Sequence, residues 1–349
     1  MPLRLFPVIA FIFCISCNQR KGPDVSAIAV NVKLKRFEQD LFSLDTNKLQ
    51  ESLQILQQNY PHFLPDFTYG ILGLRPDSLL QSPLEMERGL KLFIHDYTSI
   101  KDSADKLFKN FGGELEEIIS GLKHVRFYFP NYKLPPAVIT FIGPLDASFQ
   151  TSFGTQGDIL TQEGLGVGLQ LHLGKNFSFY QSTQGQELFP EYISSNFTPE
   201  SIPVNCMKNI CDDLYPDKSG GRPLIDQMVE KGKRLYLLQS FLPETPEHLL
   251  ISYSEKQLKD SYANEAVIWD FFLNNQLLNT SEQNVIKNYV GESPRTQEFG
   301  EGSPGNLGSF AGWQIVKKYM EKFPDLSLSD MMTKDPHQVY TDSKYKPRN

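Results

Sequence analysis

The spacing of apolar side chains predicts a chain that is mostly helical. In several long stretches an apolar residue recurs every three or four positions, which is the spacing of one face of an α-helix. These stretches are residues 49–60, 86–97, 107–122, 204–214, 225–238 and 258–272. Asp45 can cap the first helix, and residues 82–85 and 254–257 have the pattern of capping boxes.

A change of period in two places predicts strands. Apolar and polar residues alternate over residues 28–34 and 167–173, and residues 137–142 form a compact apolar run. The stretch of roughly twenty residues after this run predicts a functional loop or a hairpin with a flexible tip. Many helices around few strands indicate an α+β fold with a small, mainly antiparallel sheet.

The N-terminal pattern is that of an export signal. Arg4 is followed by the apolar run 5–15, the small residue Ser16 and then Cys17. The run has about eleven residues, whereas a helix that spans a bilayer needs roughly 20. We therefore expect a signal peptide over residues 1–16, with a signal cleaved elsewhere or a short buried helix as alternatives.

The cysteine after the small residue distinguishes a lipoprotein signal from an ordinary one. We expect Cys17 to carry covalent lipid, whose two or three acyl chains anchor the protein to a membrane. Residues 17–27 are polar and without periodicity, which favours a flexible tether. A globular domain then covers residues 28–349, either undivided or with subdomains over about 28–130 and 131–349.

The net charge of the chain limits the classes of partner that we expect. The chain has a formal net charge of −7, whereas nucleic-acid binding requires a basic face, so we expect no nucleic-acid partner. No stretch is basic enough to hold an anionic bilayer. The expected membrane contact therefore rests on the lipid at Cys17, and we expect no other cofactor.

Two cysteines remain once the signal and Cys17 are set aside. Two leftover thiols in an oxidising compartment favour a disulfide. However, Cys206 and Cys211 are five positions apart and point away from each other on a regular helix, whereas a bridge needs Cα atoms within about 7 Å. The sequence leaves two interpretations open: a disulfide across a broken helix, or two buried thiols.

Known catalytic motifs are missing from the chain. None of the six histidines lies three or four positions from another, although paired histidines on one helix face are typical of zinc hydrolases. The chain has no Gly-x-Ser-x-Gly turn and no phosphate-binding glycine loop before a helix. We therefore expect no enzymatic activity, no catalytic residue and no metal site.

Two clusters are candidate pocket walls. The first combines aromatic and polar side chains on one helix: Tyr253, Glu255, Gln257, Asn264, Glu265 and Trp269. The second is the glycine-rich turn 301–308, which precedes an aromatic helix. Small residues there let the backbone approach a ligand or a partner helix closely. Both clusters can equally be capping and packing devices.

Longer strings of residues carry a family resemblance. They are residues 36–42, 166–174, 253–258, 264–269 and 303–316. Together, in this order and after the lipoprotein start, they resemble the gliding motility lipoprotein GldB family of the Bacteroidetes. The resemblance implies a cell-envelope protein required for, or associated with, gliding and the linked secretion machinery. It implies no defined enzymatic activity.

This family is in turn similar to predicted zinc proteases with His-Glu-x-x-His on a helix and a Glu-Gly pair downstream. The corresponding positions here are residues 204–211 and the pair Lys231 and Gly232, which include no histidine and have a lysine in place of the acid. An ammonium group repels Zn²⁺. The resemblance therefore implies a zincin-like arrangement that has lost its metal.

We expect the former cleft to bind an extended peptide by strand addition along an edge strand at residues 167–173. The candidate cleft residues are Gln170, His172, Tyr253, Glu255, Glu265, Trp269, Glu301 and Trp313. The leading interpretation is a lipid-anchored, non-catalytic envelope protein that faces the periplasm and contacts gliding or secretion proteins. The alternative is a peptidase-like envelope hydrolase with an unrecognised active site in the same cleft.

Overall fold

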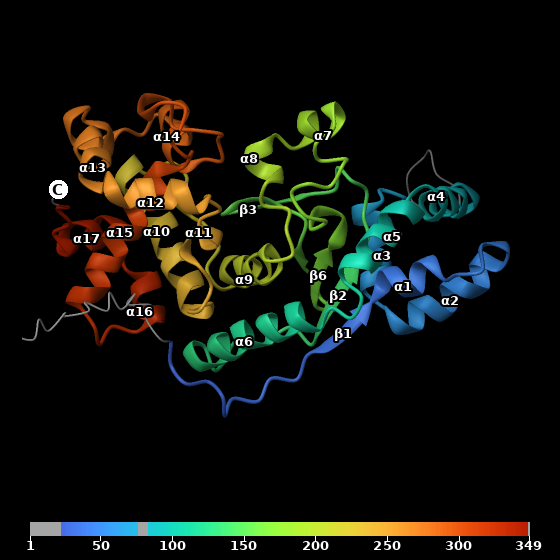
Figure 1. The fold of residues 1–349 in the computed structure, drawn as a ribbon. Helices are drawn as coiled ribbons and strands as arrows, with labels where there is room; N and C mark the ends of the chain where they lie inside the picture. The colour runs from blue at the N-terminus through green and yellow to red at the C-terminus, as the bar shows by residue number, and fades with distance from the viewer. Residues whose placement is uncertain (1–21, 76–82, 348–349) are drawn as a thin grey trace, which may run out of the picture.

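The computed structural model describes residues 22–75 and 83–347 (Figure 1). Many helices surround a small amount of sheet, which confirms the α+β class. The expected signal peptide, Cys17 and Ser82 of one predicted capping box lie outside these residues. Within them, no helix has the length and apolar character needed to cross a bilayer.

The helical elements follow the apolar stripes. The α-helices are α1 (Phe37–Phe42), α2 (Leu49–Asn59), α3 (Phe63–Pro65), α4 (Pro83–Asp96), α5 (Thr98–Leu107), α6 (Gly112–Tyr128), α7 (Thr183–Leu188), α8 (Glu191–Ser194), α9 (Ser201–Leu214), α10 (Leu224–Phe241), α11 (Glu247–Leu250), α12 (Glu255–Ala263), α13 (Glu265–Asn274), α14 (Gln283–Val290), α15 (Leu307–Lys322), α16 (Leu328–Thr333) and α17 (Pro336–Ser343). The short helical turns are η1 (Thr46–Lys48), the π-helix η2 (Asp66–Ile71), η3 (Leu169–Leu171), η4 (Leu277–Asn279) and η5 (Gln297–Phe299).

Two predicted helices are each divided into two. The stripe at 107–122 ends α5 and forms α6, and the stripe at 258–272 is split between α12 and α13 at Asn264. The capping box that opens α12 is confirmed, because the Ser254 side chain accepts from the Gln257 N–H and the Gln257 side chain accepts from the Ser254 N–H. Asp45 accepts from the Asn47 N–H and so caps η1, which leads directly into α2.

The main sheet is mixed, not mainly antiparallel. Its strands are ordered β1 (Lys33–Arg36), β2 (Ala137–Phe141), β6 (Leu165–Gly168) and β5 (Ile159–Leu160). β2 pairs in parallel with both β1 and β6, whereas β5 and β6 are antiparallel. The helices α1–α6 connect β1 to β2, and such a long crossover returns the chain to the same end of the sheet. β3 (Phe149–Thr151) and β4 (Gly154–Gln156) form a separate antiparallel hairpin.

The prediction of an exposed edge strand at residues 167–173 is wrong. β6 ends at Gly168, lies between β2 and β5, and is followed by the turn η3. Every residue from 165 to 172 is buried, so the alternating pattern does not indicate a solvent-exposed face. Gly168 also lies against the neighbouring backbone, because a Cβ there would be 2.4 Å from the Gly157 carbonyl oxygen.

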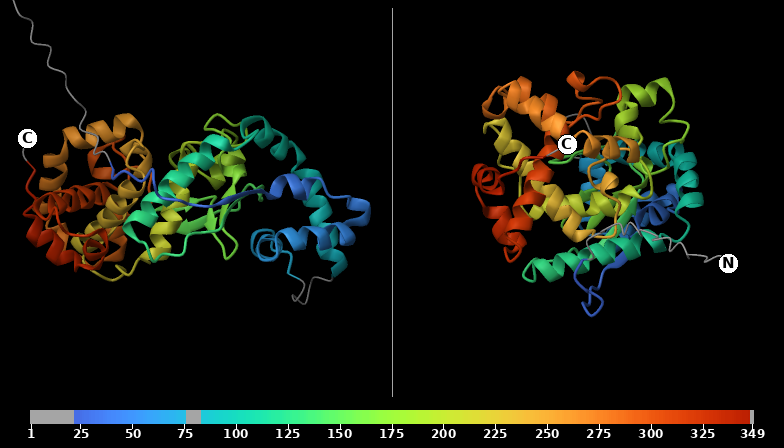
Figure 2. Two further views of the ribbon diagram at one scale, coloured as in Figure 1. Left: turned by 90° about the horizontal axis from the view of Figure 1, so that it is seen from below. Right: turned by 60° about the vertical axis from the view of Figure 1, so that its left-hand side comes forward.

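The other alternating stretch is extended but mostly unpaired. Half-buried Ile28, Val30 and Val32 alternate with exposed neighbours, and only the segment that follows them pairs as β1. The extended stretch before β1 runs along α6 (Figures 1 and 2). At its beginning, Gly22 lies against Pro243, where a Cβ would be 2.6 Å from the proline Cγ. The N-terminal approach to the body is therefore fixed beside the end of α10.

Close backbone contact between α10 and α15 explains the glycine that directly precedes Trp313 in α15. A Cβ on Gly312 would be 1.7 Å from the Met228 carbonyl oxygen, and one on Gly232 would be 2.2 Å from the Gly312 carbonyl oxygen. Only glycine fits at both positions. At Gly312 the close approach predicted from the sequence is thus to a partner helix, whereas Gly302 and Gly305 of the preceding turn line a cleft.

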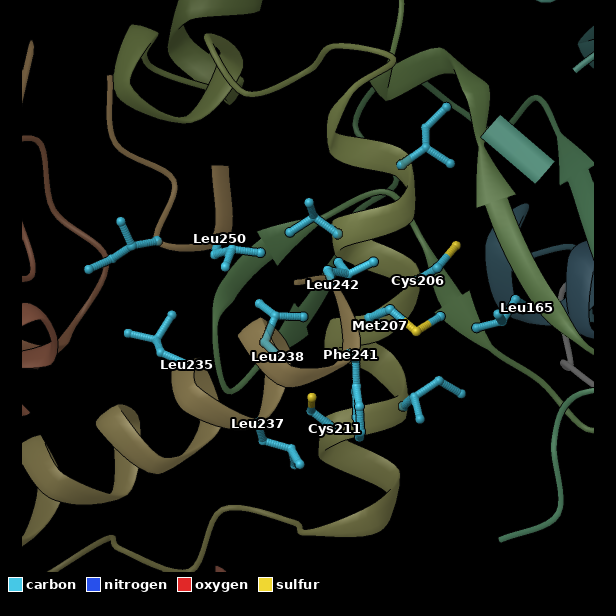
Figure 3. Packing of buried hydrophobic residues seen from close by; sticks show 14 of the residues in the cluster. Leu165, Cys206, Met207, Cys211, Leu235, Leu237, Leu238, Phe241, Leu242 and Leu250 are labelled. Carbon is cyan, nitrogen blue, oxygen red and sulfur yellow. The ribbon is translucent and has the colours of Figure 1, made fainter. Parts of the chain in front are cut away.

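The two body cysteines are free thiols. α9 is unbroken from residue 201 to 214, and both Cys206 and Cys211 are buried within it. Figure 3 shows their sulfur atoms on different sides of α9, with Cys211 toward Leu237 and Leu238 of α10. Burial raises the pKa of both thiols well above the ordinary value. Of the two interpretations, the structure supports buried thiols.

Candidate functional site

A cleft of about 1670 Å³ lies between the central part of the molecule and the C-terminal helices. Its lining comes from the β3–β4 hairpin, the segment around α8, α9, α10, and the loops that flank α11, α14 and η5. In Figure 1 the elements α8, α9, α11 and α12 surround this region, and β3 points into it. The size and mixed lining suit an elongated ligand more than a small metabolite.

The β3–β4 hairpin is fixed at its tip. Ser152 donates its N–H to Asp212 at 2.8 Å and its hydroxyl to the same carboxylate. Lys231 Nζ donates to the Ser152 carbonyl oxygen at 2.5 Å and forms an ion pair with Asp217 at 3.2 Å. Because Asp212 lies on α9 and Lys231 on α10, both helices hold the hairpin against the cleft.

The two edges of the hairpin differ. On β4, Thr155 donates its N–H to Glu292 at 3.2 Å and its hydroxyl to the same carboxylate at 2.7 Å. On the other side, β3 pairs with no strand but β4 among residues 22–75 and 83–347. Gln150 on β3 is exposed and lines the cleft. A strand edge of this kind can accept an additional strand.

Lys208 forms part of the cleft floor. Its residue surface is only 6% exposed, and its Nζ donates to Ser252 Oγ at 3.2 Å. The amine also lies 5.8 Å from the centre of the Phe153 ring. Burial lowers its pKa from 10.5 to about 8, although the charges of Glu292, Asp158 and Asp212 oppose this shift.

Two further cations of the cleft are already paired. Arg234 donates to Glu230 at 3.0 Å and to the Tyr215 carbonyl oxygen at 2.9 Å. Lys231 is held by Asp217 and the hairpin, as described above. Lys175 also lines the cleft but is exposed, so Lys208 is the buried lysine of the cleft that has no ion pair in the part of the chain that the structure describes.

His172 belongs to a closed interior network and not to an outward strand face. Its Nε2 lies 2.9 Å from Asp158 Oδ2, and its Nδ1 lies 3.1 Å from both the Thr198 carbonyl oxygen and Ser201 Oγ. Ser201 in turn donates its hydroxyl to Thr198 at 2.7 Å. Both ring nitrogens are within hydrogen-bond distance of partners. This arrangement resembles a hydrolytic triad in residue type, but the serine hydroxyl donates to a backbone carbonyl oxygen and not to the ring.

Three of the eight predicted cleft residues line the cleft: Tyr253, Glu255 and Glu301. Tyr253 is buried and donates its hydroxyl to the Gly305 carbonyl oxygen at 2.8 Å, which joins the two predicted clusters. Glu255 and Glu301 are exposed at the rim. The sequence thus located one wall of the cleft.

The other five predicted residues are outside the cleft lining. Gln170 is buried beside Gly143, and His172 is in the interior network. Trp269 packs against Tyr345, whose hydroxyl donates to Glu265 at 2.7 Å. Trp313 is fully buried in the core. Glu265 and Trp269, the two of these residues that belong to the first cluster, therefore have the packing role that was the alternative for that cluster.

The sequence patterns did not point to Lys208 or Ser252, but they did predict a functional loop or a hairpin in the stretch after residue 142. The β3–β4 hairpin lies in this stretch, with a tip that is fixed and not flexible. One signal for Lys208 is present, because it lies four positions after Val204 on the apolar stripe of α9. A cation on an apolar stripe needs a buried partner. Ser252 and the hairpin residues come from stretches without periodicity and reach the site only through the tertiary fold.

The stretches compared with a lost metal site do meet in this cleft. Asn205 and Lys208 of α9 line it together with Lys231 of α10. Within the described ranges, no three His, Cys, Asp or Glu side chains converge at a point that could hold a metal ion. The donor groups of these three residues are two amines and one amide, which are poor ligands for Zn²⁺.

Comparison with known proteins identifies one relationship. A family model described as gliding motility protein GldB matches residues 18–347. The match covers almost the whole chain and includes every element that lines the cleft. Neither the curated proteins nor the solved structures include a match.

Proposed function

We propose a function from the premise that the chain belongs to the GldB family of gliding motility proteins, which its match over residues 18–347 establishes. In this proposal the protein acts without catalysis by binding an extended segment of a partner protein in the cleft. The partner is a component of the gliding or secretion machinery. The bound segment adds as a strand to the open edge of β3.

The observation that carries this proposal is the fixed hairpin with one unpaired edge inside a large cleft. Asp212 and Lys231 hold its tip and Glu292 holds β4, so only the β3 edge is available among the described residues. A rigid strand edge loses little entropy when a peptide adds to it. Strand addition, expected at residues 167–173, is therefore proposed at β3 instead.

The proposal also includes a lipid anchor at Cys17 in the cell envelope, with the body on the periplasmic side. The residues after the anchor lead to Gly22, which packs beside Pro243, and then along α6 to β1. In Figure 1 this segment runs below α6, whereas α8 and α14, which flank the cleft, lie at the top. The described chain thus begins on the α6 side of the body, whereas two elements that flank the cleft lie on the other side in this view.

Site-specific photo-crosslinking in intact cells tests the binding mode. A photoreactive residue at Gln150, on the open edge, is compared with one at Glu51, which is exposed on α2. We expect position 150 to crosslink to one contiguous segment of one envelope protein, mapped by mass spectrometry, and position 51 to give no such adduct. Identical adducts from both positions, or none from position 150, would contradict strand addition at β3.

A hydrolase in the same cleft is the second candidate, and the Lys208–Ser252 pair is the observation that favours it. An amine 3.2 Å from a serine hydroxyl can act as the base that takes the hydroxyl proton during attack on an acyl group. A fluorophosphonate probe followed by peptide mapping tests this role. A covalent adduct at Ser252 that is lost in Lys208→Met would favour the hydrolase over the binding protein.

A further inference from the structure

The buried cations of the described chain fall into two kinds. Lys233 and Arg234 each have a carboxylate oxygen of Glu230 at 2.8 and 3.0 Å, respectively. Lys233 also donates to the carbonyl oxygens of Met332 and Lys334. Lys208 is the third lysine or arginine that is buried in residues 22–75 and 83–347, and no carboxylate there lies within 4.0 Å of its amine.

The single hydrogen-bond partner of Lys208 occupies an unusual backbone position. Ser252 follows α11 and has a φ of 61°, in the left-handed region that favours glycine. Its N–H donates to the Leu249 carbonyl oxygen and the next N–H donates to the His248 carbonyl oxygen, which is a common way to end a helix. The side chain retained at this position provides the hydroxyl that contacts the amine.

The amine has unused donors at the surface of the cleft. An ammonium group has three N–H donors, and one hydrogen bond, to Ser252, is formed. Both residues line the cleft. A buried ammonium group without a counterion is costly. An anionic group of a bound ligand would remove this cost and use the remaining donors.

The surrounding charges select the kind of anion. Glu292, Asp158 and Asp212 are close enough to act on Lys208 through their charges, as is the Cys211 thiol. A phosphate dianion would face these carboxylates with one unpaired cation to offset them, whereas a carboxylate brings a single negative charge. The adjacent hairpin also favours a peptide as the source.

We propose that Lys208 and Ser252 form a receptor for a carboxylate of the peptide that binds in the cleft. This inference rests on the proposed function, because it names the chemistry of the ligand for the same site. The carboxylate is that of an acidic side chain or of a C-terminus. Bidentate contact is possible, with the ammonium group and the serine hydroxyl donating to the two oxygens.

Proton linkage gives the receptor a measurable property. In the free protein the pKa of Lys208 is about 8, and a bound carboxylate raises it because an opposite charge favours the protonated amine. Binding therefore takes up protons above this pH, and affinity falls as the pH rises through about 8. A neutral ligand produces no such dependence through Lys208.

The first test uses a small anion and no peptide. Trace acetylation of the full-length protein with acetic anhydride, read by mass spectrometry at each lysine, reports the pKa of the Lys208 amine. We expect sodium propionate to raise this pKa and sodium chloride at equal ionic strength to leave it unchanged. Exposed Lys175, which also lines the cleft, serves as the internal control. An identical titration of Lys208 in both salts overturns the receptor.

The second test uses nonapeptides of alternating Thr and Val that differ in one group. The first has a central Asp and an amidated C-terminus. The second, neutral peptide has a central Asn and an amidated C-terminus, and the third has the central Asn and a free C-terminus. We expect the wild-type protein to bind at least one carboxylate peptide about tenfold more tightly than the neutral peptide. Which of the two is preferred identifies the source of the carboxylate.

Variants separate the receptor from the cleft as a whole. Lys208→Met should bind all three peptides alike, Lys175→Met should keep the preference, and Ser252→Ala should reduce it. A preference that persists in Lys208→Met overturns the inference while the proposed function stands. A propionate effect at Lys208 without binding of any peptide contradicts peptide binding but supports the receptor.

Discussion

Two buried sites with ionisable side chains lie close together in this protein. They differ in whether the ionisable side chain has an ionisable partner. Asp158 and His172 form a pair in the interior, and their side chains also contact Gly168 of β6, Thr198 before α9 and Ser201 at the start of α9. Lys208, at the cleft floor, has a hydroxyl partner and no ion pair in the described residues. Both sites bury ionisable side chains, but only in the interior pair does one ionisable side chain contact another.

This difference distinguishes a structural site from a candidate binding site. A buried charge is tolerated when it is paired and hydrogen-bonded, and its removal then leaves an uncompensated partner. An unpaired buried charge destabilises the folded chain, so its presence requires another explanation. At Lys208 that explanation is a ligand that completes the site.

The interior pair should give the largest effect. Asp158→Ala removes the partner of His172 Nε2 and of the Gly168 N–H, which lies 3.1 Å from Asp158 Oδ1. We expect the free energy of unfolding to fall by about 3–5 kcal/mol, as measured by denaturant titration. Asp146→Ala, at an exposed position, is the control. An equal, small effect of both changes would show that the interior pair is not structural.

The cleft lysine should give an effect of opposite sign. Lys208→Met removes a buried amine whose pKa is lowered from 10.5 to about 8, so the free energy of unfolding near neutral pH should rise by about 3 kcal/mol. The wild-type protein should also gain stability from pH 8 to 10.5, because the folded chain then binds fewer protons than the unfolded chain. Loss of stability in Lys208→Met would mean that the amine is already satisfied.

A third change tests how tightly the interior is packed at a position that has no charged group. Gly312→Ala places a methyl group against the Met228 backbone, where a Cβ would be 1.7 Å from the carbonyl oxygen. We expect a loss of about 2 kcal/mol in the free energy of unfolding. Gly302→Ala is the matched control, since a Cβ there meets nothing within 4 Å. A tolerated Gly312→Ala would show that α10 and α15 can separate.

A substitution at the rim of the cleft should have the smallest effect on the free energy of unfolding. Glu301 is exposed, and its contact with Arg295 is 3.5 Å at the surface. Glu301→Gln should change the free energy of unfolding by less than about 0.5 kcal/mol. A larger loss, seen in the same denaturant titration, would place this residue among the structural groups and not at an open rim.

The sequence was sufficient for elements defined by local periodicity or capping. The stripes of α2, α9 and α10 and the capping box of α12 are all present, because each depends on residues close together in the chain. The parallel strand pairs were not predicted. The β1–β2 pair spans the long α1–α6 crossover, whereas the β2–β6 pair joins Val138 to Leu165 across the stretch that contains β3, β4 and β5. Pairing between segments this far apart in the sequence leaves no local pattern.

The site was harder to predict than the fold. Trp269 and Trp313 attracted attention as large aromatic residues in patterned strings, but they pack in the core. Lys208 and Ser252 are 44 positions apart, and neither is in a recognisable motif. The conspicuous strings mainly describe how helices pack, whereas the cleft floor combines residues whose proximity only the folded chain creates.

Proton uptake on peptide binding is the most direct test of the central claim, which is that Lys208 binds a carboxylate of the ligand. Calorimetry with the Asp-containing peptide, in buffers of different ionisation enthalpy and above the Lys208 pKa of about 8, counts the protons taken up. The prediction is uptake of up to about one proton by the wild-type protein and none by Lys208→Met. Binding of the same peptide without proton uptake by the wild-type protein would contradict it.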